Sequence, residues 1–330
     1  MAFPIAFGRD RDVFVMGRAN VDMYVTDPAD SLETAVLFEK SVGGSAANIA
    51  VGLSRLGRQV SMISRVSADP FGEFVRHFLN EAGVDCQHVD ADDSGARTSL
   101  AFAERRVEES QVLFYRNNAA DLRIQPQDLP EKEWAKTSLL VVTGTGLSAS
   151  PSREATLSAL ESARGEGCRT VLDLDWREAA WNNPSEAPFF YNQALSQSDV
   201  VIGTVEEFSV LDQNIDWIGE GREAPAGVQK ILQGGTSLVV VKRGKLGSAA
   251  YTDDGNVYRA GIYPVSVAKN YGAGDAFAAA FLHGLLQGDD AGVAMDLGAA
   301  AAAIVVSSVG CASSAPNLTT LEDFRQQYQT

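Results

Sequence analysis

The chain has 330 residues, of which 45% are hydrophobic and 21% charged, a composition typical of a globular protein with a substantial core. Its formal net charge of −16 argues against a nucleic-acid-binding surface, so any anionic ligand would have to be held by local groups. Three widely spaced cysteines indicate neither a disulfide framework nor a zinc cluster, and no export signal or membrane-spanning stretch is evident. We therefore expect a protein of the reducing cytoplasm.

Short runs of β-branched residues alternate with amphipathic helical stretches along the chain. The predicted strands are residues 13–17, 60–64, 139–144, 170–175, 199–203 and 238–244. These runs are too uniformly apolar for a half-exposed sheet, which favours a central, mostly parallel sheet covered by helices on both faces. The sequence therefore predicts a single α/β domain over residues 1–330, built as a three-layer α/β/α sandwich.

Two segments depart from this alternation of strands and helices. Residues 21–42 and 97–116 alternate apolar and polar side chains, which is typical of antiparallel strands with one face in water. We expect them to form a small antiparallel sheet outside the main one, where it could act as a lid.

Residues 43–57 read GGSAANIAVGLSRLG. Two glycines followed by small residues and a helical pattern place backbone N–H groups and the Asn48 side chain near a helix start, where an anion or a polar ligand binds readily. The same pattern could instead serve only close packing between helices.

Residues 143–149 read TGTGLSA, which has the form of a dinucleotide-binding turn between a strand and a helix. This makes an NAD-dependent oxidoreductase the rival enzyme class. The motif lies in mid-chain, however, and no acidic residue ends a strand about 20 residues later, because Asp173 comes too late. The oxidoreductase is therefore a remote alternative.

Residues 269–277 read KNYGAGDAF and lead into an alanine-rich helix. A helix that starts at small residues aims its unpaired N–H groups and its positive dipole end at one point, which makes an anion hole. An aspartate there would repel a phosphate. Its presence is explained if Asp275 accepts a proton from a hydroxyl that attacks phosphorus. Aspartate is also a good helix N-cap, so a structural role stays open.

GGSAANIA and GAGDAF, in this order and more than 200 residues apart, resemble the two signature motifs of the ribokinase-like (phosphofructokinase B) family of carbohydrate kinases. The resemblance covers nearly the whole chain, with an early G-x-x-N-x-D at Gly17, Asn20 and Asp22 and a late strand and turn at 239–247. It implies the ribokinase-like fold with a β lid, an ATP- and Mg²⁺-dependent sugar kinase and, by analogy with relatives, a homodimer paired through the lid. A non-catalytic sugar-binding protein of the same fold is an alternative.

The resemblance also implies roles for single residues. Asp275 matches the general base, and the amides of Gly272, Ala273 and Gly274 match the groups that stabilise the transferring phosphoryl group. The matching sugar-binding positions are Asn20, Asp22, Gly43, Gly44 and Asn48. The matching nucleotide positions are Thr204, where the family has asparagine, Glu207, which is also the implied metal ligand, Lys242, Gly244 and Gly247.

Two arginines bear on the choice of sugar. Arg116 ends a predicted lid strand and Arg177 follows the strand at 170–175, and a guanidinium there could fork onto a carboxylate. The segments around them are similar to the sugar-acid kinases of the family, which implies phosphorylation of the C6 hydroxyl of 5-dehydro-2-deoxy-D-gluconate in inositol catabolism. Kinases of 2-keto-3-deoxygluconate and of fructose are alternatives on the same scaffold. The arginines could instead pair with neighbours such as Asp121 and Glu178.

Lys269 is a departure from the family pattern. The family usually has an aspartate here that helps to hold an activating monovalent cation. A lysine cannot ligate K⁺, but its ammonium could occupy the same electropositive place beside the anion hole. We expect activity to depend little on K⁺, unless Lys269 only points to solvent.

Overall fold

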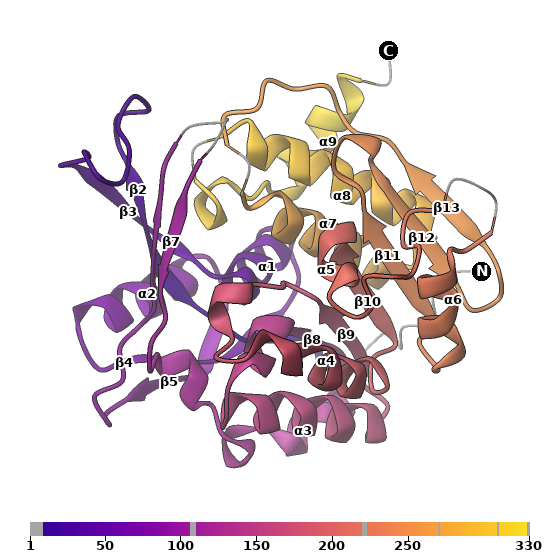
Figure 1. The fold of residues 1–330 in the computed structure, drawn as a ribbon, viewed down its shortest axis with the longest axis horizontal. Helices are drawn as coiled ribbons and strands as arrows, with labels where there is room; N and C mark the ends of the chain where they lie inside the picture. The colour runs from indigo at the N-terminus through magenta and orange to yellow at the C-terminus, as the bar shows by residue number, and fades with distance from the viewer. Residues whose placement is uncertain (1–8, 106–109, 220–222, 270, 309, 329–330) are drawn as a thin grey trace.

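The structure, a computed structural model, describes residues 9–105, 110–219, 223–269, 271–308 and 310–328 (Figure 1). At its centre the described residues form a nine-stranded sheet in the order β13-β12-β11-β10-β9-β8-β1-β4-β5. Its strands are β1 (Arg11–Met16), β4 (Val60–Ser67), β5 (Asp85–Asp92), β8 (Thr137–Thr143), β9 (Arg169–Asp173), β10 (Val200–Thr204), β11 (Leu238–Lys242), β12 (Ser248–Thr252) and β13 (Val257–Ala260). All strands predicted for the main sheet are confirmed.

The sheet is parallel from β11 to β5, and only β12 and β13 run antiparallel at one edge. Within β1, Val13 and Val15 enter one buried apolar cluster while Phe14 and Met16 enter another, because successive side chains of a strand point to opposite faces. Both faces of the sheet are therefore covered, as a three-layer sandwich requires.

The helices divide between these two faces. They are α1 (Ser45–Arg55), α2 (Pro70–Glu81), α3 (Ser152–Gly165), α4 (Ala187–Leu195), α5 (Val205–Ser209), α6 (Ala226–Gln233), α7 (Ala273–Gln287), α8 (Ala291–Val306) and α9 (Leu318–Gln326). Residues of α1, α2, α7 and α8 pack on the Val13 side, and residues of α3, α4 and α6 pack on the Phe14 side. No helix among the described residues is long and apolar enough to cross a membrane.

A second, four-stranded sheet stands beside the main one, at the left of Figure 1. It consists of β2 (Asn20–Val25), β3 (Phe38–Gly43), β6 (Leu100–Ala103) and β7 (Val112–Tyr115), in the order β3-β2-β6-β7. The predicted lid sheet is confirmed, and its two antiparallel hairpins are joined by one parallel pair, β2 with β6. Residues 106–109 of the second lid segment lie outside the described residues.

The chain reverses its direction of travel across the main sheet between β1 and β8. From β1 it passes through the lid and α1 to β4 on one side, whereas β8 to β11 extend on the other side. Ligands of open α/β sheets bind at such a switch point, outside the carboxyl ends of the strands. The residues that follow β1, β8, β9, β10 and β11 are therefore the first place to look for a site.

Candidate active site

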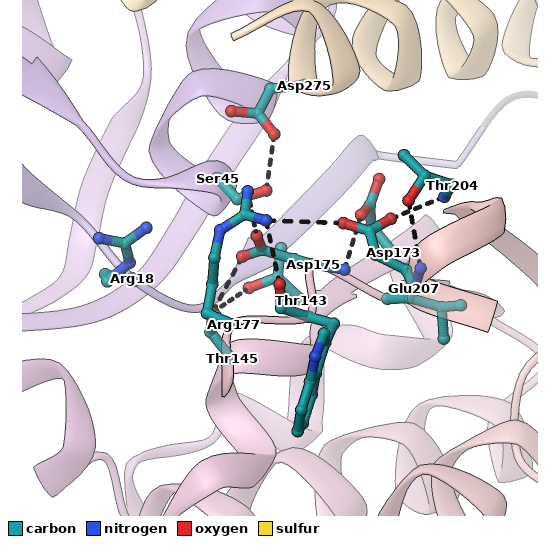
Figure 2. Close-up of polar contacts among 12 residues, drawn as sticks. Arg18, Ser45, Thr143, Thr145, Asp173, Asp175, Arg177, Thr204, Glu207 and Asp275 are labelled. Atoms are coloured by element: carbon teal, nitrogen blue, oxygen red, sulfur yellow. Dashed lines mark hydrogen bonds and ion pairs between the residues drawn. The ribbon is translucent and has the colours of Figure 1, made fainter. Parts of the chain in front are cut away.

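Asp275 lies in the first turn of α7 and connects the two glycine-rich motifs (Figure 2). Its carboxylate accepts hydrogen bonds from Ser45 Oγ at 2.8 Å and from Asn48 Nδ2 at 2.7 Å, both in the first turn of α1. The N-cap of α7 is Gly272, and no side chain caps this helix. The alternative in which Asp275 serves as an N-cap is therefore wrong.

The start of α7 requires glycine at position 272. Gly272 has φ 83°, in the left-handed region, and a Cβ there would lie 2.7 Å from Cys311 Sγ. The N–H groups of the first turn of a helix have no acceptor within the helix. Lys242 Nζ lies 3.2 Å from the place that a Cβ on Gly274 would occupy, so a cation lies beside this helix start.

The electrostatics of this region favour proton transfer at Asp275. Burial raises the pKa of Asp275, and the Asp175 carboxylate adds to this, against the opposing hydrogen bonds from Asn48 and Ser45 and the charge of Lys242. A carboxylate whose pKa is raised is a better proton acceptor near neutral pH than an ordinary aspartate. The structure thus places a buried carboxylate of raised pKa in the first turn of α7.

Acidic and basic side chains alternate along the carboxyl edge of the sheet. Lys242 Nζ lies 3.4 Å from Asp173 Oδ2, and Arg177 lies 3.1 Å from Asp175 Oδ1 and 3.8 Å from Glu207 Oε1 (Figure 2). Burial lowers the pKa of Lys242, but Asp173, Glu207 and Asp275 outweigh it, and the resulting pKa is raised. Lys242 is therefore a cation at neutral pH.

Thr204 and Glu207 form the capping box of α5. Thr204 Oγ1 accepts from the Glu207 N–H at 3.2 Å, and Glu207 Oε2 accepts from the Thr204 N–H at 2.7 Å. One Glu207 oxygen is therefore engaged by the backbone, while the other faces Arg177. The described residues contain no cluster of three or more His, Cys, Asp or Glu side chains suited to a metal ion.

The predicted sugar-binding residues lie together at the base of the lid. Asn20 Nδ2 donates to Asp22 Oδ1 at 2.6 Å, and the Tyr24 hydroxyl donates to Asp22 Oδ2 at 2.6 Å. A Cβ on Gly43 would lie 2.1 to 2.2 Å from the Asp22 carboxyl group, so only glycine leaves room for this side chain. Gly44 has φ 99° and is the N-cap of α1, so it joins the end of lid strand β3 to the helix that carries Asn48.

Gly244 and Gly247 form the turn between β11 and β12. Both have positive φ, 55° and 77°, and a Cβ on Gly247 would lie 2.0 Å from the Ala260 carbonyl oxygen. The turn positions Lys242 at the end of β11. These two glycines therefore have a structural requirement, whatever else they contact.

A pocket of about 330 Å³ lies between the lid and the sheet edge. Its described lining includes Arg18, Phe114, Arg116, Thr145 and Arg177. Arg116 and Arg177 thus meet at one pocket although their strands belong to different sheets.

Arg116 and Arg177, the two residues predicted to bind a carboxylate of the substrate, already pair with acidic side chains of the protein. Arg116 Nε donates to Asp121 Oδ2 at 2.9 Å, and its Nη1 donates to the Thr145 carbonyl at 3.1 Å. Arg177 pairs with Asp175 and Glu207, and its side chain is 45% exposed. The alternative pairing of Arg116 with Asp121 is present in the structure, whereas the carboxylates paired with Arg177 are Asp175 and Glu207 rather than Glu178.

Lys269 is buried, with 2% of its surface exposed, so the alternative that it points to solvent is wrong. Its ammonium donates to the Gly310 carbonyl and to Cys311 Sγ at 3.4 Å, and it lies 5.2 Å from the centre of the Tyr271 ring. Burial lowers the pKa of Lys269, while Cys311, Asp22 and Asp275 oppose this change. The Lys269 amine is therefore enclosed by the protein close to the start of α7.

Two residues of the site were missed by sequence reasoning. Ser45 donates to Asp275, and its only signal is a polar residue directly after two glycines at a helix start. Arg18 lines the pocket and is 6% exposed, and its signal is a charged residue directly after a buried strand. Neither pattern distinguishes a ligand from a packing residue by itself.

These features are those of a kinase that phosphorylates sugars, and the chain belongs to the pfkB family of carbohydrate kinases, whose model matches residues 10–318. Among its curated relatives, proteins named 5-dehydro-2-deoxygluconokinase share 39% identity in Geobacillus kaustophilus and 41% in Photobacterium profundum. These alignments cover 96% of this chain and 94% of the first relative, and 97% of this chain and 97% of the second.

Solved structures of similar fold agree with this assignment. A fructokinase double mutant from Vibrio cholerae, with fructose, ADP and potassium ion bound, has a TM-score of 0.84 and 28% identity, covering 96% of this chain and 98% of its own. A fructokinase from Xylella fastidiosa with bound ATP has a TM-score of 0.83 and 25% identity, covering 97% of this chain and 99% of its own. The family and these neighbours exclude the oxidoreductase.

The glycines of residues 143–149 have a packing role in the structure. A Cβ on Gly144 would lie 2.2 Å from the Leu174 carbonyl oxygen and 2.4 Å from the Tyr191 hydroxyl. A Cβ on Gly146 would lie 2.7 Å from Thr156 Oγ1. The two glycines of this dinucleotide-like motif are therefore explained by close packing directly after β8.

Proposed function

We propose that this carbohydrate kinase transfers the γ-phosphate of ATP to the C6 hydroxyl of 5-dehydro-2-deoxy-D-gluconate, as a step of inositol catabolism. The observation that carries the proposal is Asp275, a carboxylate of raised pKa held by Ser45 and Asn48 at the start of α7. The relatives of about 40% identity that bear this activity in their names support the choice of substrate.

In the proposed mechanism, Asp275 accepts the proton of the C6 hydroxyl as its oxygen attacks the γ-phosphorus. The N–H groups of Gly272, Ala273 and Gly274, with the positive end of the α7 dipole, stabilise the charge on the phosphoryl group. Lys242 adds a full positive charge next to Gly274. The ADP oxygen leaves in line, so the protein contributes positioning and charge stabilisation rather than covalent chemistry.

The nucleotide side of the site consists of Thr204, Glu207, Lys242, Gly244 and Gly247, at the ends of β10 and β11. Glu207 fits a magnesium ion because one of its oxygens is free of the capping box, and Mg²⁺ is usually held by one or two carboxylates together with substrate phosphates and water. When bound, the ion would neutralise phosphate charge. Arg177 would contribute by holding Glu207 in place.

The sugar side consists of Asn20, Asp22, Gly43, Gly44 and Asn48. Asp22 and Asn20 offer short polar side chains that suit paired sugar hydroxyls. Arg116 and Arg177, at the pocket between lid and sheet, would bind the carboxylate of the acid. Closure of the lid would exclude water, which would otherwise compete with the sugar for the phosphoryl group.

The buried ammonium of Lys269 is proposed to supply the charge that a monovalent cation supplies in relatives. This is supported by its contact with the Gly310 carbonyl, an oxygen of the kind that ligates K⁺. The fructokinase neighbour with potassium ion bound makes the comparison pertinent. Activity of this chain should therefore depend little on K⁺.

We further propose a homodimer paired through the lid and a cytoplasmic location. The outer face of the lid supports the first, because Leu113 and Tyr115, which line one surface hollow with Phe38 and Phe102, are 47% and 56% exposed, and large apolar side chains gathered on one face favour an interface. The three free thiols, Cys86, Cys168 and Cys311, support a reducing compartment.

The direct test is ADP release by the purified enzyme with MgATP and a panel of sugars. 5-Dehydro-2-deoxy-D-gluconate should give the highest kcat/KM, above 2-keto-3-deoxygluconate and fructose, which are the alternative substrates. A higher kcat/KM for fructose would reject the proposed substrate and leave the kinase assignment intact. No ADP release with any sugar, but sugar binding that persists, would favour the non-catalytic alternative.

A further inference from the structure

The pocket between the lid and the sheet edge is strongly basic although the chain as a whole is acidic. Among the described residues that line it, four are arginines, Arg18, Arg116, Arg123 and Arg177, and none is acidic. In a chain of net charge −16, a pocket lined by several arginines is not explained by the overall charge. This cluster of arginines therefore indicates an anionic ligand.

Three of these arginines are already engaged by partners at the pocket. Arg116 is forked onto Asp121, and Arg177 is paired with Asp175. Arg123 lies at the rim, where its Nη2 donates to Asn118 Oδ1. Their positive charges are thus matched by acids or lie close to water.

Arg18 differs from them in burial and in partners. It is 6% exposed, yet it forms no direct ion pair with any described residue, although the charges of Asp175, Asp121 and Asp22 act on it from a greater distance. Its Nη1 donates to Asn20 Oδ1 at 2.9 Å, its guanidinium lies 5.3 Å from the centre of the Phe114 ring, and its Nε has no hydrogen-bond partner among the described residues. Figure 2 draws Arg18 apart from the network of dashed contacts around Arg177.

A buried, unpaired guanidinium is unfavourable in the free protein. Burial lowers the pKa of Arg18 in spite of the neighbouring carboxylates, so the cost of desolvation exceeds their attraction, and arginine still keeps its charge under ordinary conditions. A carboxylate in direct contact would offset this cost. Arg18 directly follows Gly17 after β1, at the switch point of the sheet, and Asn20 connects it to Asp22 of the sugar side. A carboxylate placed at Arg18 would therefore belong to a molecule that also contacts the sugar-binding residues.

We propose that Arg18 is the residue that selects an acid over a neutral sugar, by forming a forked ion pair with the carboxylate of the substrate. The inference rests on the proposed function, since it assigns the binding of the acid group within that site. Arg116 and Arg177, which line the same pocket, then add attraction for that carboxylate while they pair with Asp121 and Asp175. Phe114, from lid strand β7, would stack on the guanidinium and hold its plane.

Two variants test this assignment, Arg18→Met and Arg18→Lys. With MgATP and 5-dehydro-2-deoxy-D-gluconate, kcat/KM should fall about 100-fold in Arg18→Met, since a charge-assisted forked pair is lost. Arg18→Lys should recover only part of this loss, because an ammonium cannot form the fork. Turnover of fructose, a neutral ketose, should change by less than about threefold in both variants.

Thermal unfolding gives a second readout that does not depend on catalysis. Without ligand, Arg18→Met should melt within about 2 °C of the wild type or above it, because a buried charge without a direct ion pair is removed. With saturating 5-dehydro-2-deoxy-D-gluconate and no ATP, the wild type should gain stability and Arg18→Met should gain little. A variant that melts much lower without ligand would mean that Arg18 is structural, and it would overturn the proposal.

Arg123→Gln is the matched control, because it removes the same charge from the rim of the same pocket. It should lower kcat/KM for the acid by less than about threefold, since an exposed charge is screened. Equal losses for Arg123→Gln and Arg18→Met, or equal losses for the acid and for fructose in Arg18→Met, would refute a specific role for Arg18. Absence of turnover of any sugar acid by the wild type would instead refute the proposed substrate.

Discussion

Replacing Asp275 with asparagine removes the proposed base while the surrounding hydrogen bonds can persist. Asp275 accepts one bond from Asn48 Nδ2 and one from Ser45 Oγ. In the Asp275→Asn variant, Oδ1 can still accept from Asn48, and the new Nδ2 can donate to Ser45, since a hydroxyl both donates and accepts. The fold of α1 against α7 should therefore survive, and the variant isolates the loss of the proton acceptor.

The expected effects on activity and on stability have opposite signs. Loss of a positioned base lowers kcat by about 10² to 10⁴, equivalent to about 2.7 to 5.5 kcal/mol of barrier, with little change in sugar affinity. The pKa of Asp275 is raised above the ordinary 3.8, so the folded protein binds this proton more tightly than the unfolded chain. Ionised Asp275 therefore destabilises the fold, increasingly as the pH rises through the raised pKa, and asparagine removes this penalty.

The assay combines turnover with thermal unfolding over a range of pH. Wild-type kcat/KM should fall as the pH drops through the raised pKa, and Asp275→Asn should lose this acidic limb. The melting temperature of Asp275→Asn should exceed that of the wild type more above the raised pKa than below it. Asp254→Asn, at an exposed turn, is the charge-matched control and should leave kcat unchanged. A kcat loss smaller than tenfold, or a proportional loss of sugar affinity, would refute the role of Asp275 as base.

Three further predictions concern other parts of the structure. Gly272→Ala should destabilise the protein by about 2 kcal/mol or more and reduce turnover, because its φ of 83° and the nearby Cys311 sulfur exclude a Cβ; an unchanged melting temperature would contradict this. Replacing Na⁺ by K⁺ in the assay should change wild-type activity by less than about twofold, and Lys269→Asp should gain K⁺ stimulation; strong stimulation of the wild type would disprove the built-in cation. Leu113→Asp, on the outer face of the lid, should turn a dimer into a monomer in light scattering after size exclusion, and a monomeric wild type would rule out the proposed dimer.

The parts of the fold that follow from local sequence were predictable. Continuous β-branched runs such as residues 238–244 indicated buried parallel strands, and the structure confirms them because their two-sided burial leaves no polar face. Each of the two glycine-rich helix starts indicated a place where a ligand can bind. In the structure the two starts meet, and Asn48 donates to Asp275.

Other features were beyond the reach of a single sequence. The edge strand β5, with the sequence DCQHVDAD, is only partly buried, so its apolar pattern is too weak to indicate a strand. Arg116 and Arg18 look alike as residues after a strand, and only the three-dimensional arrangement shows that Asp121 pairs directly with Arg116 while Arg18 forms no direct ion pair among the described residues. Charge pairing of this kind depends on tertiary contacts and leaves no local signal.

The hydrogen bonds from α1 to Asp275 span 227 and 230 residues of sequence, which has a consequence for how the enzyme is made. At about 5 to 20 residues per second, a ribosome needs roughly 10 to 45 seconds to synthesise the intervening chain. During that time Gly52 of α1 lacks its contact with Ala279 of α7. In the folded protein the two pack so closely that a Cβ on Gly52 would lie 2.6 Å from the methyl group of Ala279. The part of α1 that contacts α7 is thus uncovered during most of synthesis, and the proposed site is complete only with the last fifth of the chain.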